Sequence, residues 1–405
     1  MAAGPAASDP RSAAATTVTR KAERLIALSH AVHGDAELAF QEHRSSARLI
    51  ELLDAAGLTV EAGVAGLDTA FVATAGSGPL TVAICAEYDA LPGIGHACGH
   101  NVIAAAAVGA GLALAPLADE LGLTVKVIGT PAEEGGGGKI LMLDAGVFDG
   151  VHAAMMVHPA PNESLTLPCL AVEHLSVSYR GREAHASGYP ELGINAADAL
   201  TVAQVGVGLL RQHLEPTHRV HGIVTHGGDA PNIVPGNTRG SWYVRASTLA
   251  ELEKLSPRVH ACFEAGALAT GCEVEIELAS PRYSEFLPDA LLLAAYEREA
   301  IAVGRVFGAR DATGQLRGPQ SGQLSGSTDM ANVSLVLPTI HPMLGIETGG
   351  AVNHQPGFTA AAVNASADRA VLDGSLSMAR TAIAVALDPD AGARLLANAA
   401  TNAAV

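Results

Sequence analysis

A thiol, an imidazole and several carboxylates lie close together in one stretch of this 405-residue chain. Cys98 and His100 are separated by one residue within Glu-Tyr-Asp-Ala-Leu-Pro-Gly-Ile-Gly-His-Ala-Cys-Gly-His-Asn (87–101), and a glutamate pair follows at 133–134. Thiolate, imidazole and carboxylate groups are the usual ligands of zinc and similar divalent ions. A structural zinc site is normally closed by four Cys or His ligands, whereas one Cys-x-His unit with carboxylates leaves a position for water. The pattern therefore favours an open metal site that activates water, although a lone Cys-x-His unit also occurs by chance.

Two adjacent glutamates, Glu133 and Glu134, can divide the tasks of such a site. Neighbouring side chains point in different directions, so one carboxylate can bind metal while the other takes a proton from the attacking water. The pair lies in Gly-Thr-Pro-Ala-Glu-Glu-Gly-Gly-Gly-Gly (129–138) and could also be an exposed acidic turn. The glycines that follow favour the first interpretation, because they let the backbone approach other groups closely.

Strand-like and helical segments alternate over the first part of the chain. We predict strands over 81–87, 124–129 and 151–157, and helices over 18–28, 42–56, 139–143 and from 102 onward. This alternation predicts a mainly parallel sheet that is covered by helices on both faces. Functional groups collect beyond the carboxyl ends of the strands in such sheets, so Asp89, the glutamate pair and His158 should meet there.

The pattern changes near residue 171 and predicts a second, smaller domain. Strands are expected over 172–179, 222–225, 240–246 and 272–278, and helices over 196–213 and 249–269. Together they describe a small α+β sandwich. After it we expect a helix over 289–307, a strand over 333–337 and a closing helix over 359–387. The predicted organisation is a flexible tail (1–20) and an α/β catalytic domain (21–171 and 285–405), interrupted by a satellite domain (172–284).

Composition excludes several classes of protein. The chain is 49% hydrophobic and 16% charged, which favours a packed globular protein over a disordered one. Its formal net charge of −17 argues against nucleic acid or an anionic membrane as a partner. Five cysteines without close pairing do not predict a disulfide framework. The first twenty residues lack the apolar core of a secretion signal. We therefore expect a cytoplasmic protein. The apolar run 102–118 is expected to be a buried helix and not a membrane span.

Three further residues are ambiguous on local grounds. His354 lies in the glycine-rich turn Gly-Gly-Ala-Val-Asn-His-Gln-Pro-Gly (349–357), His185 in Gly-Arg-Glu-Ala-His-Ala-Ser (181–187), and Asn232 in Pro-Asn-Ile-Val-Pro. Judged locally, each is an ordinary loop residue. Four other histidines at 213, 218, 221 and 226 are too irregularly spaced to predict a metal site.

The order of these motifs resembles the two-metal aminoacylase and carboxypeptidase superfamily, over roughly residues 25–387. The resemblance is carried by segment 87–101, Pro-Ala-Glu-Glu-Gly, Val-His-Pro, Gly-Arg-Glu-Ala-His-Ala and Pro-Asn-Ile-Val-Pro. Segments 87–101, 209–222 and 326–334 are most similar to the aminoacylase-like branch that includes β-alanyl-lysine dipeptidase. The same superfamily contains auxin-conjugate amidohydrolases and p-aminobenzoyl-glutamate hydrolase.

This resemblance implies two divalent ions per subunit, zinc or manganese, and a satellite domain that forms a homodimer. Matched by motif, the metal ligands would be Cys98, His100, Glu134, His158 and His354. Glu133 would be the general base, and Asp89 would orient a ligand. His185 would reach across the dimer to stabilise the oxyanion, and Asn232 would help to hold the substrate.

Three positions depart from related sequences. Glu87 stands where more distant relatives have a histidine ligand, Asn101 replaces the aspartate of the auxin-conjugate branch, and Ala36 stands where many relatives have proline. None of these differences removes a catalytic group, so they bear on the choice of substrate.

The predicted function is a metal-dependent amidohydrolase or dipeptidase that cleaves N-acyl amino acids or dipeptides, with a basic residue on the leaving side. The alternative is a hydrolase of p-aminobenzoyl-glutamate or another N-acyl amino acid. A non-catalytic scaffold is a further alternative, and the complete set of site residues argues against it. A hydrolase with a cysteine nucleophile is another, and unlike a metal-dependent enzyme it would remain active in the presence of a chelator.

Overall fold

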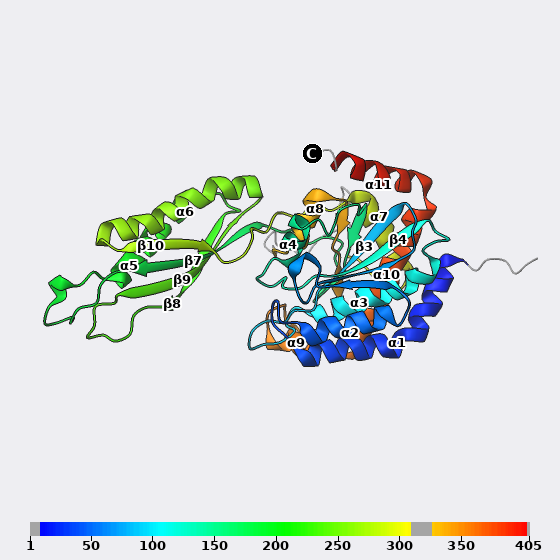
Figure 1. Ribbon diagram of the computed structural model, residues 1–405, viewed down its shortest axis with the longest axis horizontal. Helices are drawn as coiled ribbons and strands as arrows, with labels where there is room; N and C mark the ends of the chain where they lie inside the picture. Colours follow the sequence, from blue (N-terminus) through cyan, green and yellow to red (C-terminus); the bar gives the residue numbers. More distant parts are fainter. Residues whose placement is uncertain (1–8, 309–325, 403–405) are drawn as a thin grey trace, which may run out of the picture. The chain divides into compact units, whose positions relative to one another are not determined.

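The computed structural model describes residues 9–308 and 326–402 (Figure 1). Contacts divide the chain into two compact units. The larger unit is formed by Met1–Pro168, Phe286–Ser325 and Asp329–Val405. The satellite unit is formed by Cys169–Glu285 together with Gly326–Thr328.

A six-stranded sheet lies at the centre of the larger unit. Its strand order is β1 (Thr59–Ala62), β2 (Phe71–Ala75), β4 (Leu123–Gly129), β3 (Leu80–Ala86), β5 (Ala153–Met155) and β11 (Thr339–Ile340). The last four strands of this order pair in parallel, whereas β2 pairs antiparallel with both of its neighbours, β1 and β4. The predicted α/β fold with a mainly parallel sheet is therefore confirmed.

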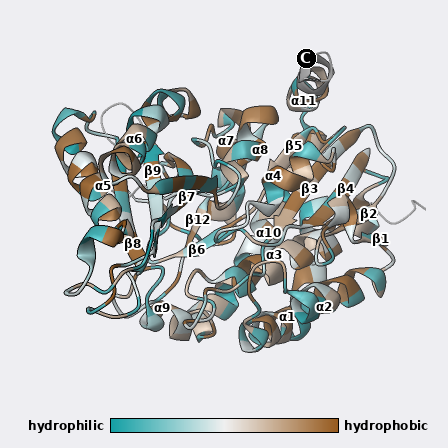
Figure 2. Ribbon diagram, turned by 60° about the vertical axis from the view of Figure 1, so that its left-hand side comes forward, coloured by the Kyte–Doolittle hydropathy of each residue, from teal (hydrophilic) through white to brown (hydrophobic). Residues whose placement is uncertain are grey.

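Helices cover both faces of this sheet. One face packs against α1 (Pro10–Asp35), α2 (His43–Asp54), α3 (His100–Leu114), α7 (Ala290–Ala302) and α10 (Ala365–Leu387), and the other against α4 (Gly138–Asp144) and α8 (Met330–Val336). Along β3, Val82 and Ile84 enter the first core while Ala83 and Cys85 enter the second. All of β3 is buried, and apart from Thr81 its residues are apolar (Figure 2).

The apolar helix after the Cys-x-His unit lies in the interior. Every residue of α3 is buried, and the helix packs against α10. By length and composition, two of the described helical segments could cross a membrane, His100–Leu117 and Ala365–Leu387, but 89% and 67% of their apolar windows are buried. Their apolar character therefore has an explanation in core packing. This unit also contains the short elements β6 (His158–Ala160), β12 (Met343–Gly345) and α9 (Pro356–Ala361), and the longer helix α11 (Pro389–Asn402).

The satellite unit is an antiparallel sheet with two helices on one face. The strand order is β10 (Glu273–Leu278), β7 (Ala171–Arg180), β9 (Asn237–Ala246) and β8 (Arg219–His226). Leu175, Trp242 and Phe263 are buried between the sheet and helices α5 (Ala196–Leu210) and α6 (Leu249–Thr270). The expected α+β sandwich is confirmed.

Three local predictions were wrong. Residues 10–20 of the expected tail belong to helix α1. The Asp9 side chain accepts a hydrogen bond from the Ser12 amide at the start of this helix, and Ala14 and Val18 are buried. The other part of the expected tail, residues 1–8, lies outside the described residues. The expected strand 333–337 belongs mainly to helix α8, whose buried residues recur with helical spacing. The expected closing helix is two helices, since Asn364 caps a new N-terminus.

Candidate metal centre and active site

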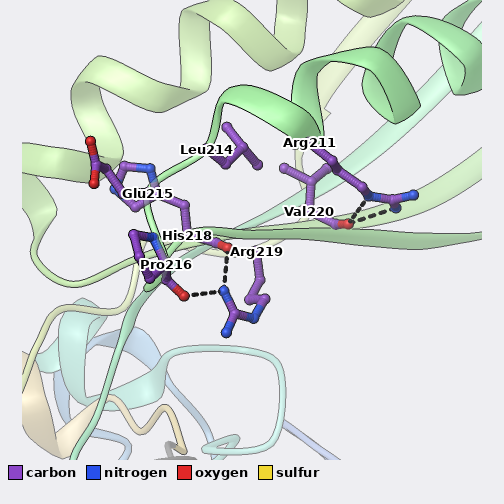
Figure 3. A pocket seen from close by; sticks show the side chains of 7 residues that line it. All are labelled: Arg211, Leu214, Glu215, Pro216, His218, Arg219 and Val220. Atoms are coloured by element: carbon purple, nitrogen blue, oxygen red, sulfur yellow. Dashed lines mark hydrogen bonds between the residues drawn. The ribbon is translucent and has the colours of Figure 1, made fainter.

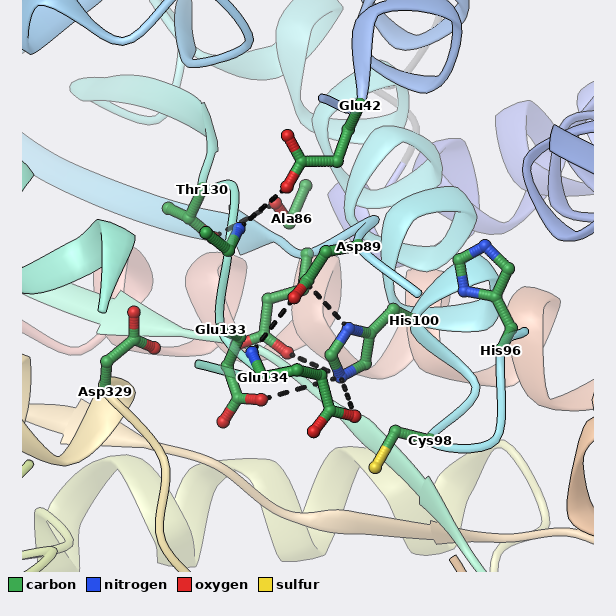
Figure 4. Close-up of polar contacts among 12 residues, drawn as sticks. Glu42, Ala86, Asp89, His96, Cys98, His100, Thr130, Glu133, Glu134 and Asp329 are labelled. Atoms are coloured by element: carbon green, nitrogen blue, oxygen red, sulfur yellow. Dashed lines mark hydrogen bonds and ion pairs between the residues drawn. The ribbon is translucent and has the colours of Figure 1, made fainter. Parts of the chain in front are cut away.

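The carboxyl ends of β3 and β4 bring most of the expected site residues together. Glu87 and Asp89 follow β3, the glutamate pair follows β4, and His100 begins α3. His100 Nε2 lies 3.5 Å from an oxygen of Glu87, 3.8 Å from Glu133 and 3.9 Å from Glu134 (Figure 4). The structure therefore gathers imidazole and carboxylate groups at the sheet edge where the sequence predicted them.

Among the described residues, three groups of side chains offer metal-binding atoms, and two of them overlap at Cys98. Cys98, His100 and His158 form one group, and Cys98, Glu134 and His354 form the other; the donor atoms within each group lie within 4.8 Å of one another. All five residues that the resemblance assigned to metal binding occur in these groups, and Cys98 belongs to both. If two ions were bound, Cys98 would be the one residue available to both groups.

Backbone geometry explains how Cys98 and His100 are presented. Gly99, between them, has φ = 74°, and a Cβ atom at this position would lie 2.4 Å from the Cγ of Pro159. Glycine is therefore required by conformation and by space. His354 also has positive φ, 68°, and its amide donates to the carbonyl of Ala97 at 2.9 Å. This bond joins a distant turn to the cysteine loop.

Hydrogen bonds orient the imidazoles toward the site. His100 Nδ1 donates to Asp89 Oδ1 at 2.9 Å, and His158 Nδ1 donates to the carbonyl of Pro159 at 2.8 Å. Both acceptors lack hydrogens, so in each neutral ring the lone pair is on Nε2. Asp89 Oδ2 also accepts the Glu134 amide at 2.9 Å. One carboxylate thus aligns residues from two loops.

The electrostatics of the site fit a cation. Burial, followed by the carboxylates of Glu87 and Glu134, raises the pKa of Glu133 well above its ordinary value. Burial and the neighbouring His100 lower the pKa of His158 to about 4, so this imidazole is neutral and can act as a ligand. Among the described residues, buried Glu87 Oε2, Glu134 Oε1 and His100 Nε2 have no hydrogen-bond partner. Several acceptors without donors in an acidic, buried site match the requirements of a divalent ion.

The same environment disfavours Cys98 as a nucleophile in its own right. Burial and the adjacent Glu134 carboxylate raise the pKa of the Cys98 thiol far above its ordinary value. A catalytic thiolate needs the opposite, a lowered pKa. A bound cation would stabilise the thiolate as a ligand.

Two buried charged residues escaped the sequence analysis. Lys139 Nζ donates to Glu87 Oε1 at 2.6 Å and to Asp329 Oδ1 at 2.7 Å, and all three side chains have zero exposure. The Lys139 amide donates to Asp329 Oδ2 at 2.9 Å. Lysine in a glycine-rich segment ordinarily indicates a solvated surface, so only the tertiary structure reveals this network.

Glu42 was missed for the same reason. It accepts hydrogen bonds from the Ala132 amide at 2.9 Å and from the Thr69 hydroxyl at 2.8 Å. Ala132 has φ = 60° and immediately precedes the glutamate pair. Glu42 therefore holds the turn that presents Glu133.

The remaining predicted site residues lie in the satellite unit. The Ala186 amide donates to the carbonyl of Asn232 at 2.9 Å, so His185 and Asn232 lie on paired segments, and both are exposed. His185 Nδ1 accepts from the amides of Gly188 at 3.0 Å and Ser187 at 3.3 Å. In the neutral ring the hydrogen is consequently on Nε2, which faces away from these bonds.

A hollow of about 290 Å³ also occurs in the satellite unit (Figure 3). Its lining residues are Arg211, Leu214, Glu215, Pro216, His218, Arg219 and Val220. Both guanidinium groups donate to backbone carbonyls, Arg211 to Val220 and Arg219 to Pro216 and His218. These cations are committed to holding the loop, and none of the candidate metal ligands lines the hollow.

The fold and the site define a metal-dependent hydrolase in which a small antiparallel unit interrupts an α/β unit. Residues 83–371 match peptidase family M20/M25/M40, and the chain belongs to this family of hydrolases. It is 41% identical to the Xaa-Arg dipeptidase of Mus musculus over 391 residues, which cover 93% of this chain and 89% of the mouse protein. Identity to the Homo sapiens Xaa-Arg dipeptidase is 38%, over 93% of this chain and 88% of that protein. A p-aminobenzoyl-glutamate hydrolase component from Escherichia coli K12 is 34% identical, over 63% of this chain and 57% of its own length.

Solved structures share the fold. An aminobenzoyl-glutamate utilization protein from Klebsiella pneumoniae superimposes with a TM-score of 0.71, at 20% identity, over 92% of this chain and 98% of that one. A dinuclear metal-binding peptidase of the M20 family from Bacillus subtilis gives a TM-score of 0.64, at 22% identity, over 91% and 99%. These structures confirm the fold, and the family match with the two Xaa-Arg dipeptidases confirms the family resemblance found in the sequence.

Proposed function

We propose that this chain is a metal-dependent dipeptidase that cleaves dipeptides with a basic carboxyl-terminal residue. The observation that carries this proposal is the 41% and 38% identity to two Xaa-Arg dipeptidases along almost the whole chain. The net charge of −17 is compatible with a cationic substrate. An N-acyl amino acid with a basic leaving residue presents the same amide bond and belongs to the same substrate class.

Two divalent ions are proposed, held by Cys98, His100, Glu134, His158 and His354. The two donor groups that share Cys98 support this number. The soft thiolate favours zinc, whereas the carboxylates also suit manganese. Such ions, when bound, would lower the pKa of a water molecule and polarise the amide carbonyl.

Glu133 is the proposed general base. It lies beside the donor groups, 3.8 Å from His100 Nε2, without being needed in either of the two groups that share Cys98. It would take a proton from the attacking water and deliver that proton to the leaving amine.

His185 is the proposed oxyanion donor, acting from the satellite unit of a partner subunit. Its Nδ1 is occupied by backbone amides, so Nε2–H is available to donate to the developing negative charge. Asn232, on the paired segment, is proposed to hold the substrate.

A homodimer would form through the satellite unit. Val202, Val205 and Leu209 are exposed along one stripe of α5, and Ile223 and Val224 are exposed on β8. β8 is an edge strand, whose free backbone groups can pair with a second chain. Burial of this apolar surface in a two-fold interface would remove it from water.

Complementation between two inactive variants tests the role across the dimer. His185→Ala and Glu133→Gln should each be inactive, but a mixed dimer would contain one site with both residues intact. A statistical mixture of two-fold dimers should recover about a quarter of wild-type activity. If His185 acted within its own subunit, the mixture would stay inactive.

We also infer a reducing, cytoplasmic location, which is supported by five free cysteines that form no disulfide. Labelling of the native protein with a thiol reagent directly after cell lysis, followed by mass spectrometry, tests this. Disulfide-bonded cysteines would contradict it.

A substrate panel tests the dipeptidase proposal. Purified, metal-loaded protein would be given Ala-Arg, Ala-Lys and β-alanyl-lysine, with Ala-Glu as the matched acidic control and p-aminobenzoyl-glutamate as the alternative substrate. We expect chelator-sensitive release of arginine or lysine, recovery after metal is restored, and resistance to thiol alkylation of the loaded enzyme. Cleavage of p-aminobenzoyl-glutamate alone would favour the alternative function, and bound metal without cleavage of any substrate would contradict the proposal.

A further inference from the structure

The five candidate metal ligands do not account for the buried network of Glu87, Lys139 and Asp329. It places two carboxylates and one ammonium in the interior, each with zero exposure. Burying an ion costs several kcal/mol unless it is well paired, so such groups are rare in protein cores. Its position at the end of β3, in contact with the candidate metal ligands, suggests that the network serves the site.

Glu87 uses its two oxygens differently. Oε1 accepts the 2.6 Å hydrogen bond from Lys139, whereas buried Oε2 has no hydrogen-bond partner among the described residues. Oε2 lies 3.5 Å from His100 Nε2, an atom that also has no hydrogen-bond partner there. His100 already donates its Nδ1 hydrogen to Asp89, so in the neutral ring two acceptors face each other.

This separation is the spacing expected of two atoms that share one ion. Zinc–nitrogen and zinc–oxygen bonds of about 2.1 Å at a tetrahedral angle place two ligand atoms about 3.4 Å apart. Glu87, His100 and Glu133 also form a third group of potential donors whose atoms lie within 4.8 Å of one another. A cation between Glu87 and His100 would satisfy both acceptors.

We propose that Glu87 is an additional ligand of the ion held by His100, and that Lys139, tied to Asp329, is the positioning residue that keeps Glu87 in place. The proposal rests on the metal-dependent function above. Lys139 fixes one oxygen of Glu87 and thereby directs the other toward His100. Asp329 in turn fixes Lys139 twice, through the ammonium and through the backbone amide.

An ordinary structural ion-pair network is the competing explanation. It would account for the bonds of Lys139 and, with a second proton on His100, for the 3.5 Å approach of Nε2 to Glu87 Oε2, but it predicts no loss of metal affinity when Glu87 or Lys139 is replaced. The two explanations differ in their consequences for metal binding, which a double variant can separate from stability.

The test compares wild type with Glu87→Gln, Lys139→Met and the double variant Glu87→Gln/Lys139→Met; Lys254→Met, at an exposed lysine of the satellite unit, is the control. Metal per chain would be measured by elemental analysis, affinity by chelator competition, and thermal unfolding by circular dichroism. Lys139→Met leaves buried carboxylates unpaired and should be the least stable, whereas the double variant should recover stability because one charge of each sign is gone.

We expect every variant at Glu87 or Lys139 to bind one of the two ions about 10- to 100-fold more weakly, with no recovery in the double variant. The visible absorption of the cobalt(II)-loaded protein should also change, since it reports the number of ligands. Wild-type affinity and an unchanged cobalt spectrum in Glu87→Gln and in the double variant would overturn the inference while leaving the dipeptidase proposal intact. Wild-type protein that binds no metal would instead contradict the proposed function itself.

Discussion

Replacement of Asp89 by asparagine should weaken metal binding without removing a ligand. Asp89 is 1% exposed and uses both oxygens, one for the His100 ring and one for the Glu134 amide. Asparagine offers one acceptor oxygen, so one of these two donors would face an amide NH₂ group instead. Either the ring of His100 loses its orientation or the backbone before the Glu134 side chain shifts.

The expected magnitude follows from the bond that is lost. A hydrogen bond to a charged group contributes about 1.5–3 kcal/mol, and each 1.4 kcal/mol is a factor of about ten in an equilibrium constant. If the loss falls on the metal-bound state, affinity should decrease by about 10- to 150-fold, close to the roughly 10- to 100-fold typical of residues that orient metal ligands. Turnover should recover largely when metal is supplied in excess, because Glu133 and the five candidate ligands remain.

Chelator competition with zinc and with manganese measures this effect, and activity is then titrated against free metal. Asp68→Asn is a suitable control, because Asp68 is exposed and lies in the same unit. The reasoning is refuted if Asp89→Asn binds metal as tightly as the Asp68→Asn control, or if excess metal restores none of the lost activity.

Three further predictions concern catalysis, backbone geometry and pH. Glu133→Gln should retain bound metal and lower kcat by about 10²- to 10⁴-fold, and near-normal turnover would exclude Glu133 as the base. Gly99→Ala should lower the unfolding free energy, measured by urea titration, more than Gly93→Ala does. Both glycines have φ = 74°, which costs alanine about 1–2 kcal/mol, but only at Gly99 would the Cβ also meet Pro159. Equal losses in the two variants would contradict this reasoning. Burial raises the pKa of Glu42 from 4.5 to about 7, so the folded state binds this proton more tightly than the unfolded state, and the associated stability is lost as pH rises through 7. Glu42→Gln should therefore lose less unfolding free energy than wild type between pH 5.5 and pH 8.5, measured by chemical denaturation. An equal loss in the variant and in wild type would argue against the raised pKa.

Much of the candidate metal site could be predicted because its residues lie at strand ends. Hydrophobic runs identified β3 and β4, and in a parallel sheet their carboxyl ends meet at one edge. Residues just beyond these ends, such as Asp89 and Glu134, were therefore expected to be neighbours. His354 had no such signal, since it reaches the site through a turn that is bonded to Ala97, and only the family resemblance identified it.

The residues that sequence analysis missed are charged groups with distant partners. Lys139 is 52 positions from Glu87 and 190 from Asp329, and Glu42 is 90 positions from Ala132. Nothing in the local sequence distinguishes a buried, paired lysine from a solvated one. The wrong strand prediction over 333–337 has a related cause, because a short apolar run fits a strand and a half-buried helix equally well.

The distant bonds also explain how a site assembled from separate loops can be ready for a metal ion before one binds. Asp89 joins the loop after β3 to the start of α3 and to the turn after β4. Lys139 joins the end of β3 to α4 and, through Asp329, to the start of α8. Each bond is charge-assisted, and all are buried except the part-buried bond from the Glu134 amide to Asp89, so moving one loop would leave a charged group unpaired elsewhere. Displacing any single ligand therefore costs free energy in several segments of the chain. For this reason we expect metal affinity to respond to residues that never touch the metal.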